Sequence, residues 1–409
     1  MLHYSPRQVR WSLLCFAINF LLGLFFCFII SPRLIGSGLT VLDPDGYGAD
    51  GIRLYETGQI TTIDKPPLYP AWVALVAWLS GGFQLNIVLI SQCLLLASAC
   101  VILYGIFRET IPVHAHWAAL ACSVYPMLLW YTSRLWTETF LTFLLALLVY
   151  LFIRLIRSPG LEIDFIVRQE KKMEVGFALL CGVVCGLVIL TKGALLIFAG
   201  LLPMITWGKF RQQAWLKIIA FLTGLSVLVI PWIWRNYQLS GEILPIHTRG
   251  GYNFFIGNGF ARHWLQAPFS YSTLKSLTQT DIDQVYREFG RIPQSPLEAD
   301  HVLMQASLNE LSARPWLFPW KIVVNSLTIW YLAADPAKSL FTGLMQLPVV
   351  FAALSGIYKA WKRRSKAINM LIPIVGILAG SLPILSFARL SSVIMPYLIG
   401  LSFENFARK

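Results

Sequence analysis

The chain has 409 residues, of which 56% are hydrophobic and only 13% are charged, and its formal net charge is +13. So few charges cannot cover a soluble protein of this size, which excludes an ordinary soluble enzyme and predicts that much of the surface faces lipid. The positive charge does not indicate a nucleic-acid-binding protein, because the Lys and Arg residues cluster between apolar segments instead of lining one soluble face.

Apolar segments long enough to cross a membrane recur from one end of the chain to the other. A helix needs roughly 20 apolar residues to cross a hydrocarbon layer of about 30 Å. The first such segment has no small-residue cleavage site, so we expect it to be retained as a span. The pattern predicts a single all-α integral membrane domain over residues 1–409, with about ten transmembrane helices. The expected spans are residues 11–31, 85–107, 117–133, 138–156, 175–191, 193–208, 216–234, 340–359, 368–386 and 391–407.

Basic residues cluster at alternate turns between the expected spans. Because Lys and Arg favour cytoplasmic turns, we expect both termini to be cytoplasmic in a plasma (inner) membrane protein. In this orientation the inner turns carry Arg7, Arg10, Arg108, Arg154 to Lys172, Lys209 to Lys217, Lys359 to Lys366, Arg408 and Lys409.

Two further apolar segments, residues 67–80 and 317–334, affect this topology. Counting either one alone as a span would move the basic residues 362–364 to the outside, so we interpret both as juxtamembrane or re-entrant helices on the outer face. The alternative in which both cross the membrane restores the later parity but inverts the basic clusters between them. The outer face then carries a first loop, residues 32–84, and a long loop, residues 235–339, which we expect to be structured.

The first outer loop contains two carboxylates and an ammonium close to the membrane interface. Asp43 and Asp45 precede Tyr47, and Lys65 follows a helix-like stretch. A carboxylate at the edge of a low-dielectric region can have a pKa high enough to accept a proton from an attacking hydroxyl, while a Lys holds a phosphate. As a loop cation, Lys65 should matter more for donor binding than for stability. The alternative is a solvated loop in which the Asp residues only cap a turn.

Other cations reach the same face from later parts of the chain. Arg134 and Glu138 are four residues apart at one outer tip, where they can pair with each other or contact a substrate. Lys192 lies at the tip of a tight helical hairpin, where an ionisable group is a functional candidate. Arg235 and Arg389 follow at two further outer ends, as site residues or as interfacial anchors.

Cysteine and histidine patterns do not predict a metal centre. All seven cysteines lie inside apolar segments, where we expect them to act as small hydrophobic residues and not to form a disulfide framework. The histidines of the long outer loop are too scattered to form a ligand pattern. They are His247, His263 and His301.

Several cations around two acids at the outer mouth of a helical bundle suit a lipid phosphate, whose chain can stay in the bilayer while its head enters the site. Nucleotide sugars would be on the wrong side of the membrane. A membrane-borne glycosyl donor is therefore favoured, although a lipid phosphatase or a transporter would also fit this argument alone.

An ordered series of motifs resembles the GT-C superfamily of polyprenyl-phosphate-sugar-dependent glycosyltransferases. Within it, the chain is similar to the branch of the protein O-mannosyltransferases and the lipid A aminoarabinose transferase. The match covers most of the chain in the right order, and single pieces of it are weak. It consists of Asp43 with Tyr47 four residues later, Ala49, Gly58, Lys65 to Pro70, Glu138, Leu190 to Gly193, Pro231 to Asn236, Gly250 and Gly251, Gly257 and Asn258, and Arg389 to Pro396.

The resemblance implies inverting transfer of a hexosyl or pentosyl group from a polyprenyl (undecaprenyl) phosphate to an acceptor hydroxyl on the outer face. Asp43 would be the general base, with Asp45 or Glu138 as a possible second acid. Lys65, with Arg235 or Arg389, would stabilise the leaving phosphate. A monophosphate requires no cofactor, and a divalent cation is optional. The residues expected to contact the donor or its phosphate are Lys65, Tyr47, Tyr69, Arg134, Lys192, Arg235 and Arg389.

Because no large outer domain follows Arg389 in this sequence, we expect a lipid-linked or cell-envelope glycan as acceptor instead of a protein. The main competing hypothesis is a polytopic transporter or flippase for a lipid-linked saccharide. Transporters tend to place ionisable residues near the midplane with repeat symmetry, whereas here the polar motifs lie at outer ends. A non-catalytic scaffold would not need Asp43 near Lys65.

Overall fold

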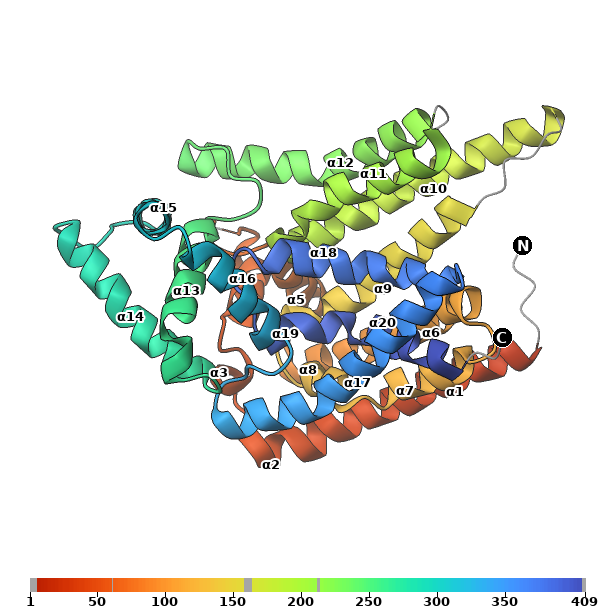
Figure 1. Cartoon of the computed structure of the whole chain (residues 1–409), viewed down its shortest axis with the longest axis horizontal. Coiled ribbons are helices and arrows are strands. Elements are labelled where there is room, and N and C mark those ends of the chain that lie inside the picture. The colour runs from red at the N-terminus through yellow and green to blue at the C-terminus, as the bar shows by residue number, and fades with distance from the viewer. Residues whose placement is uncertain (1–5, 61, 158–163, 212–213, 407–409) are drawn as a thin grey trace.

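The computed structural model describes residues 6–60, 62–157, 164–211 and 214–406. All regular structure in these ranges is helical, which confirms the predicted all-α class. Most long helices run side by side along the long axis of the molecule (Figure 1). The start of the first helix and the last helical turn lie at one end of this bundle, which we call the inner end.

Seven helical segments in the described ranges are long and apolar enough to cross a membrane, so the chain has the composition of an integral membrane protein. The first combines α1 (Pro6–Phe25), a π-helical turn (Phe26–Ile30) and α2 (Ser31–Ile35). The others are α6 (Leu85–Thr110), α9 (Thr137–Arg157), α10 (Asp164–Thr191), α11 (Phe198–Phe210) with its preceding 3₁₀ turn (Gly193–Ile197), α12 (Ala214–Ser240) and α17 (Pro336–Lys362).

The expected count of ten spans is not confirmed, because three expected spans are interrupted. Residues 117–133 divide into α7 (Ala115–Ser123) and α8 (Pro126–Thr132), since the residue before Pro126 is forced out of helical geometry. The other two become shorter pieces packed inside the bundle. These pieces are α18 (Leu371–Ser381) after a 3₁₀ turn (Lys366–Met370), and α19 (Ala388–Ser391), a 3₁₀ turn (Ser392–Ile394), α20 (Met395–Ser402) and a last 3₁₀ turn (Phe403–Phe406).

The two segments expected to be juxtamembrane helices form α5 (Leu68–Leu79) and α16 (Leu317–Thr328). Each helix has 12 residues. A helix of that length rises roughly 18 Å, which is too short for a hydrocarbon layer of about 30 Å. Their length therefore favours the outer-face interpretation over the alternative in which both cross the membrane.

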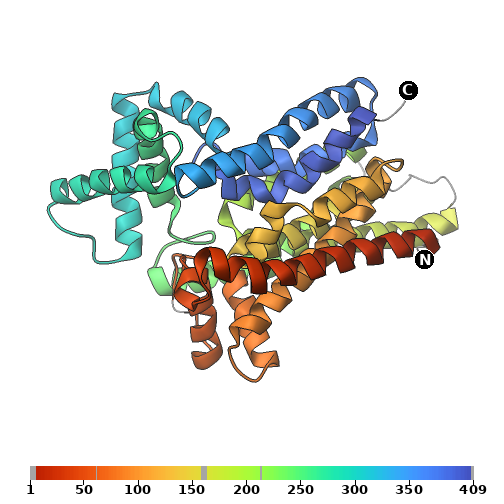
Figure 2. The same cartoon turned by 90° about the horizontal axis from the view of Figure 1, so that it is seen from below.

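The predicted long outer loop is largely helical and begins later than expected, because α12 continues to Ser240. It folds into α13 (Gly250–His263), α14 (Tyr271–Glu288) and α15 (Pro296–Ala313), followed by α16. The helices α13, α14 and α15 share a small apolar core that includes Phe255, Phe260 and Leu274. We call residues 250–332 the outer subdomain; it lies at the end of the bundle opposite the termini (Figure 2).

The first outer loop is also ordered. It contains α3 (Leu39–Leu42) and α4 (Tyr47–Thr57) before α5 begins.

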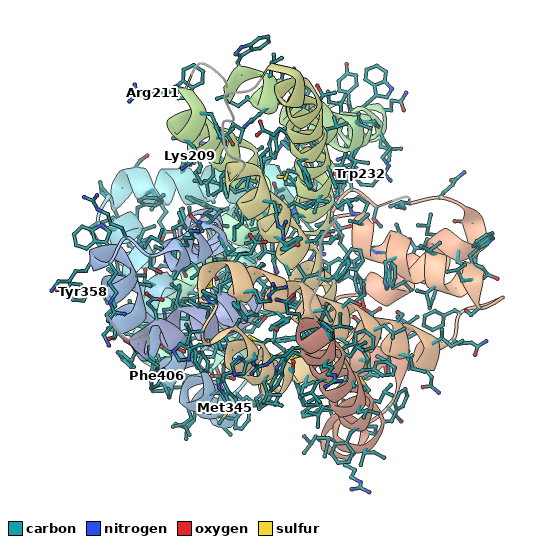
Figure 3. All side chains as sticks on the ribbon, turned by 90° about the vertical axis from the view of Figure 1, so that its right-hand side faces the viewer. Lys209, Arg211, Trp232, Met345, Tyr358 and Phe406 are labelled. Carbon is teal, nitrogen blue, oxygen red and sulfur yellow. The ribbon has the colours of Figure 1, made fainter. Side chains whose placement is uncertain are left out.

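At the opposite end of the molecule, Lys209 and Arg211 mark the turn that follows α11 (Figure 3). The basic turn thus lies at the end that carries the termini, as the positive-inside pattern requires.

Close backbone contact holds α10 against α12. A Cβ atom added at Gly182 would lie 1.9 Å from the carbonyl oxygen of Phe221, and one at Gly224 would lie 2.2 Å from that of Leu179. Because both obstacles are backbone atoms, neither can move aside without separating the helices.

We predict that Gly182→Ala destabilises the protein by about 1–3 kcal/mol, because the added methyl group forces α10 and α12 apart. Gly176→Ala is the matched control on the same helix, since nothing lies within 4 Å of its added Cβ. Thermal unfolding in one detergent should lower the Tm of the Gly182 variant alone. Equal melting temperatures for the two variants would contradict the close packing.

Candidate active site

Asp43 ends α3 and lies directly before the left-handed turn at Gly46, where φ is 71°. Its carboxylate is 8% exposed, and Oδ2 accepts a hydrogen bond of 2.9 Å from the backbone N–H of Ala49 in the first turn of α4. Asp43 therefore does cap a helix, as the structural alternative held. Its second oxygen, Oδ1, is buried and has no hydrogen-bond partner among the described residues.

The pKa values of Asp43 and Asp45 are shifted in opposite directions. Burial raises the pKa of Asp43, although the amides of Ala49, Gly48 and Tyr47 and the Lys65 ammonium partly oppose the shift. Burial alone would also raise the pKa of Asp45, but Arg389 outweighs it and holds that pKa below its usual value. Of the two, Asp43 is therefore the better proton acceptor near neutral pH.

Four charged side chains from distant parts of the chain meet beside this loop. The Arg389 guanidinium donates to Glu138 Oε1 at 2.7 Å and to Asp45 Oδ2 at 2.5 Å. The ammonium of Lys192 donates to the same Glu138 oxygen at 3.2 Å. We call Asp45, Glu138, Lys192 and Arg389 the outer ion cluster. It joins the first outer loop, the start of α9, the α10–α11 turn and α19.

Burial within the outer ion cluster is graded. The side chain of Glu138 is 1% exposed, those of Arg389 and Lys192 are 16% and 22% exposed, and that of Asp45 is 39% exposed. Glu138 Oε2 is buried without a hydrogen-bond partner among the described residues. Arg389 also stacks on the indole ring of Trp136, with its guanidinium carbon 4.2 Å from the ring centroid. The sequence did not predict Trp136 as a site residue, because a tryptophan at a helix end is usually an interfacial anchor.

Lys65 is not the exposed loop cation that was expected, so this expectation is wrong. Its ammonium donates to Asp50 Oδ2 at 2.7 Å and to the carbonyl oxygen of Gly46 at 3.2 Å. The Lys65 side chain is 14% exposed and that of Asp50 is 10% exposed. Lys65 therefore ties the segment before α5 to α4. Asp50 was missed, although it lies seven residues after Asp43 in the same motif.

The remaining predicted residues lie outside the outer ion cluster. Arg134 donates to the carbonyl of Val41 at 2.7 Å instead of pairing with Glu138, and Arg235 donates to the carbonyl of Thr62 at 3.0 Å. Since both guanidiniums hold loop backbone, their first role is to shape the outer loop.

The two predicted tyrosines differ in their surroundings. Tyr69 is fully buried and donates to Gln92 Oε1 at 2.9 Å, so it belongs to the core beneath the site. Tyr47 is partly buried and packs edge-to-face against Tyr69, with 5.9 Å between ring centroids. Tyr47 is therefore the one that lies at the loop.

The seven cysteines are all buried free thiols. The histidines expected to be scattered have separate partners: His263 bonds Asp281, and His301 lies 3.1 Å from Glu242. No group of three or more His, Cys, Asp or Glu side chains in the described part of the chain could hold a metal ion.

The arrangement combines a buried carboxylate with a pair of cations that can bind an anion. The carboxylate of Asp43 has one hydrogen-bonded oxygen and one oxygen without a partner among the described residues. Asp43 can accept a proton at Oδ1, and Lys192 and Arg389 can share a phosphate if the exposed Asp45 turns away. These groups suit the transfer of a group from a phosphate to a hydroxyl.

No protein-family model matches the sequence, and no curated protein matches it significantly. Among solved structures, the chain is similar to the archaeal oligosaccharyltransferase AglB from Archaeoglobus fulgidus, in complex with an inhibitory peptide and a dolichol-phosphate. The TM-score is 0.60, and the sequence identity is 14% over 98% of this chain and 50% of that chain. The apo form of the Archaeoglobus fulgidus oligosaccharyltransferase gives a TM-score of 0.59 and 13% identity over 98% of this chain and 51% of that one.

ArnT from Cupriavidus metallidurans, bound to undecaprenyl phosphate, aligns with a TM-score of 0.41 and 15% identity over 97% of this chain and 77% of that chain. The chain spans about half the length of the archaeal enzyme it matches. At these identities the similarity establishes the fold alone. The archaeal oligosaccharyltransferase belongs to the GT-C superfamily that the ordered motifs resemble, so the shared fold agrees with the predicted one.

We predict that Asp43→Asn abolishes turnover while the Tm at neutral pH stays equal or rises. The pKa of Asp43 is raised in the folded protein, so the folded state binds more protons between the unfolded and folded pKa values. The ionised carboxylate therefore costs stability above the folded pKa, and a neutral amide of the same shape removes that cost. Turnover of the parent should also fall as the pH drops through the raised pKa. Retained turnover in Asp43→Asn would contradict the assignment of the base.

We predict that Lys65→Ala and Asp50→Ala each destabilise the protein and are not additive, because each removes the same ion pair. Unfolding of both single variants and the double variant should give a coupling energy of about 1 kcal/mol. Additive losses would show that the pair contributes nothing to the loop.

Proposed function

We propose that the chain is an inverting glycosyltransferase that moves a sugar from a polyprenyl phosphate to a hydroxyl of a lipid-linked or cell-envelope glycan at the extracytoplasmic face. The observation that carries this proposal is the unpaired Oδ1 of buried Asp43, two residues before Asp45 of the outer ion cluster in the first outer loop. The GT-C fold supports the same reaction class.

In the proposed reaction Asp43 takes the proton of the acceptor hydroxyl through Oδ1. The hydroxyl oxygen attacks the anomeric carbon from the side opposite the phosphate, and the bond between that carbon and the phosphate oxygen breaks. The sugar changes its anomeric configuration and polyprenyl phosphate leaves with the electron pair. The raised pKa of Asp43 supports its role as the base, because a base works best when its pKa approaches the working pH.

The phosphate is assigned to Lys192 and Arg389. Asp45 is the most exposed member of the outer ion cluster, so it is the acid that a phosphate can displace from Arg389. Glu138 stays buried between the two cations and holds them in place. We no longer assign the phosphate to Lys65 or Arg235, because Lys65 pairs with Asp50 and Arg235 donates to loop carbonyls.

A monophosphate leaving group with two cations beside it needs no metal for charge neutralisation, so we propose a reaction without a required cofactor. A dolichol-phosphate bound to the archaeal oligosaccharyltransferase supports a lipid phosphate as the carrier. The basic turn at the inner end supports cytoplasmic termini and an outer site.

A flippase for a lipid-linked saccharide is the alternative. The position of the outer ion cluster disfavours it, because a transported substrate needs polar groups near the midplane. The two activities differ in their products: a transferase releases free polyprenyl phosphate, and a flippase returns an intact donor.

The test is turnover by purified protein in lipid nanodiscs with a panel of polyprenyl-phosphate hexoses and pentoses and an envelope glycan extract. We expect free polyprenyl phosphate to appear with one donor, and to disappear in Asp43→Asn. Asp283→Asn, an exposed acid on α14, is the control and should keep full activity. Movement of an intact donor across vesicles with no released phosphate would overturn the proposed function.

A further inference from the structure

The short helix α16 has its polarity reversed relative to a helix on a soluble surface. The face turned into the protein carries Lys321, Asn325 and Thr328, which are at most 1% exposed. The face turned outward carries Val323 and Leu327, which are 48% and 45% exposed. A helix that buries polar groups and exposes apolar ones is stable only where its outer face meets lipid or an apolar partner.

Its neighbours identify lipid as that contact. Trp316, immediately before α16, is 61% exposed, and Leu265 and Phe269 of the outer subdomain are 78% and 53% exposed. Exposed aromatic groups are typical of the membrane interface. Seven residues separate α16 from α17, a candidate span whose Leu340 and Leu344 are 63% and 61% exposed. Only a short connection therefore separates α16 from a candidate span with exposed leucines at its outer end.

The inward face of α16 holds the chain segment 382–388, which links α18 to α19. Asn325 donates to the carbonyl of Leu382 at 2.7 Å and accepts from the N–H of Ser386 at 3.3 Å. The hydroxyl of Thr328 donates to the carbonyl of Ser386 at 3.0 Å. These bonds fix the segment from one side.

The other side of this segment packs against α13. A Cβ atom added at Gly257 would lie 1.8 Å from the carbonyl oxygen of Ile384, so the two backbones are in direct contact. Arg389 follows this segment immediately, at the outer ion cluster. The segment held by α16 and α13 therefore leads directly into the residue that carries this guanidinium.

We propose that α16 docks into the outer leaflet of the bilayer and that Asn325 positions Arg389 through the segment 382–388. The docking claim rests on the burial pattern alone, and the link to lipid-phosphate binding rests on the proposed function. The membrane contact and the contact with the segment that leads to Arg389 then lie on two faces of one helix.

The docking claim is tested with nitroxide labels in nanodiscs, at Val323→Cys on α16, at Leu344→Cys on α17 as the lipid reference and at Gln284→Cys on α14 as the water reference. The unlabelled parent measures background reaction of the native buried thiols. We expect the label at 323 to collide with oxygen, as at 344, and to be protected from a water-soluble nickel chelate. Accessibility to the chelate equal to that at 284 would overturn the docking claim.

The positioning claim is tested by binding of undecaprenyl phosphate to the parent, Asn325→Ala, Arg389→Ala and the double variant. We expect each single variant to bind roughly tenfold more weakly and the double variant no more weakly than Arg389→Ala. Additive losses would overturn the positioning role, because a merely structural defect would weaken both backgrounds equally.

Two further variants keep the test independent of folding. Ser326→Ala is the matched control, because its hydroxyl bonds only the Ile322 carbonyl of the same helix, and it should bind like the parent. Thr328→Val removes one hydrogen bond to the segment, whereas Asn325→Ala removes two. If Asn325→Ala unfolds, Thr328→Val takes its place in the test, and we expect it to weaken lipid-phosphate binding by less than roughly tenfold. A parent that binds no undecaprenyl phosphate would overturn the proposed function and the positioning claim, whereas the labels decide docking separately.

Discussion

A guanidinium at the edge of a membrane has to be neutralised where it lies, because moving it away from water is costly unless acceptors surround it. Arg389 meets this constraint with Glu138, Asp45 and the face of Trp136. Its partners come from two distant parts of the chain, the first outer loop and the start of α9, so these parts have to meet α19 in order to satisfy one side chain. The contacts of Arg389 thereby join the first outer loop and the start of α9 to the C-terminal helices.

The same arrangement separates the roles of the two loop acids. Asp45 is occupied by Arg389 and stays ionised, while Asp43 is left with helix amides and one unpaired oxygen. A carboxylate kept in that state lowers the stability of the folded chain and is retained where it has a chemical task. The stable pairs, Lys65 with Asp50 and Arg235 with the loop carbonyls, hold the loop around it.

Local sequence was sufficient for the helical class and for the long apolar spans, since these depend on composition and length. It was insufficient where a proline interrupts an apolar run, as at Pro126, because the residue count alone still suggests a span. Four of the predicted residues, Asp45, Glu138, Lys192 and Arg389, lie together in the structure, but the sequence did not predict how they pair. Arg134 and Arg235 donate to backbone carbonyls. Whether a cation pairs with a carbonyl or a carboxylate depends on which group the folded chain brings close to it. The reversed polarity of α16 is visible in the spacing of Lys321, Asn325 and Thr328, although the pattern alone cannot say which face is buried.

The proposed mechanism centres on a phosphate shared by Lys192 and Arg389 beside a free Asp43. The most direct test is an experimental structure of the protein in a lipid nanodisc with polyprenyl phosphate bound. We predict a phosphate within hydrogen-bond distance of both cations, with Asp45 turned away from Arg389 and Oδ1 of Asp43 facing the space beside it. A phosphate bound elsewhere, with the contact between Asp45 and Arg389 intact, would contradict the account.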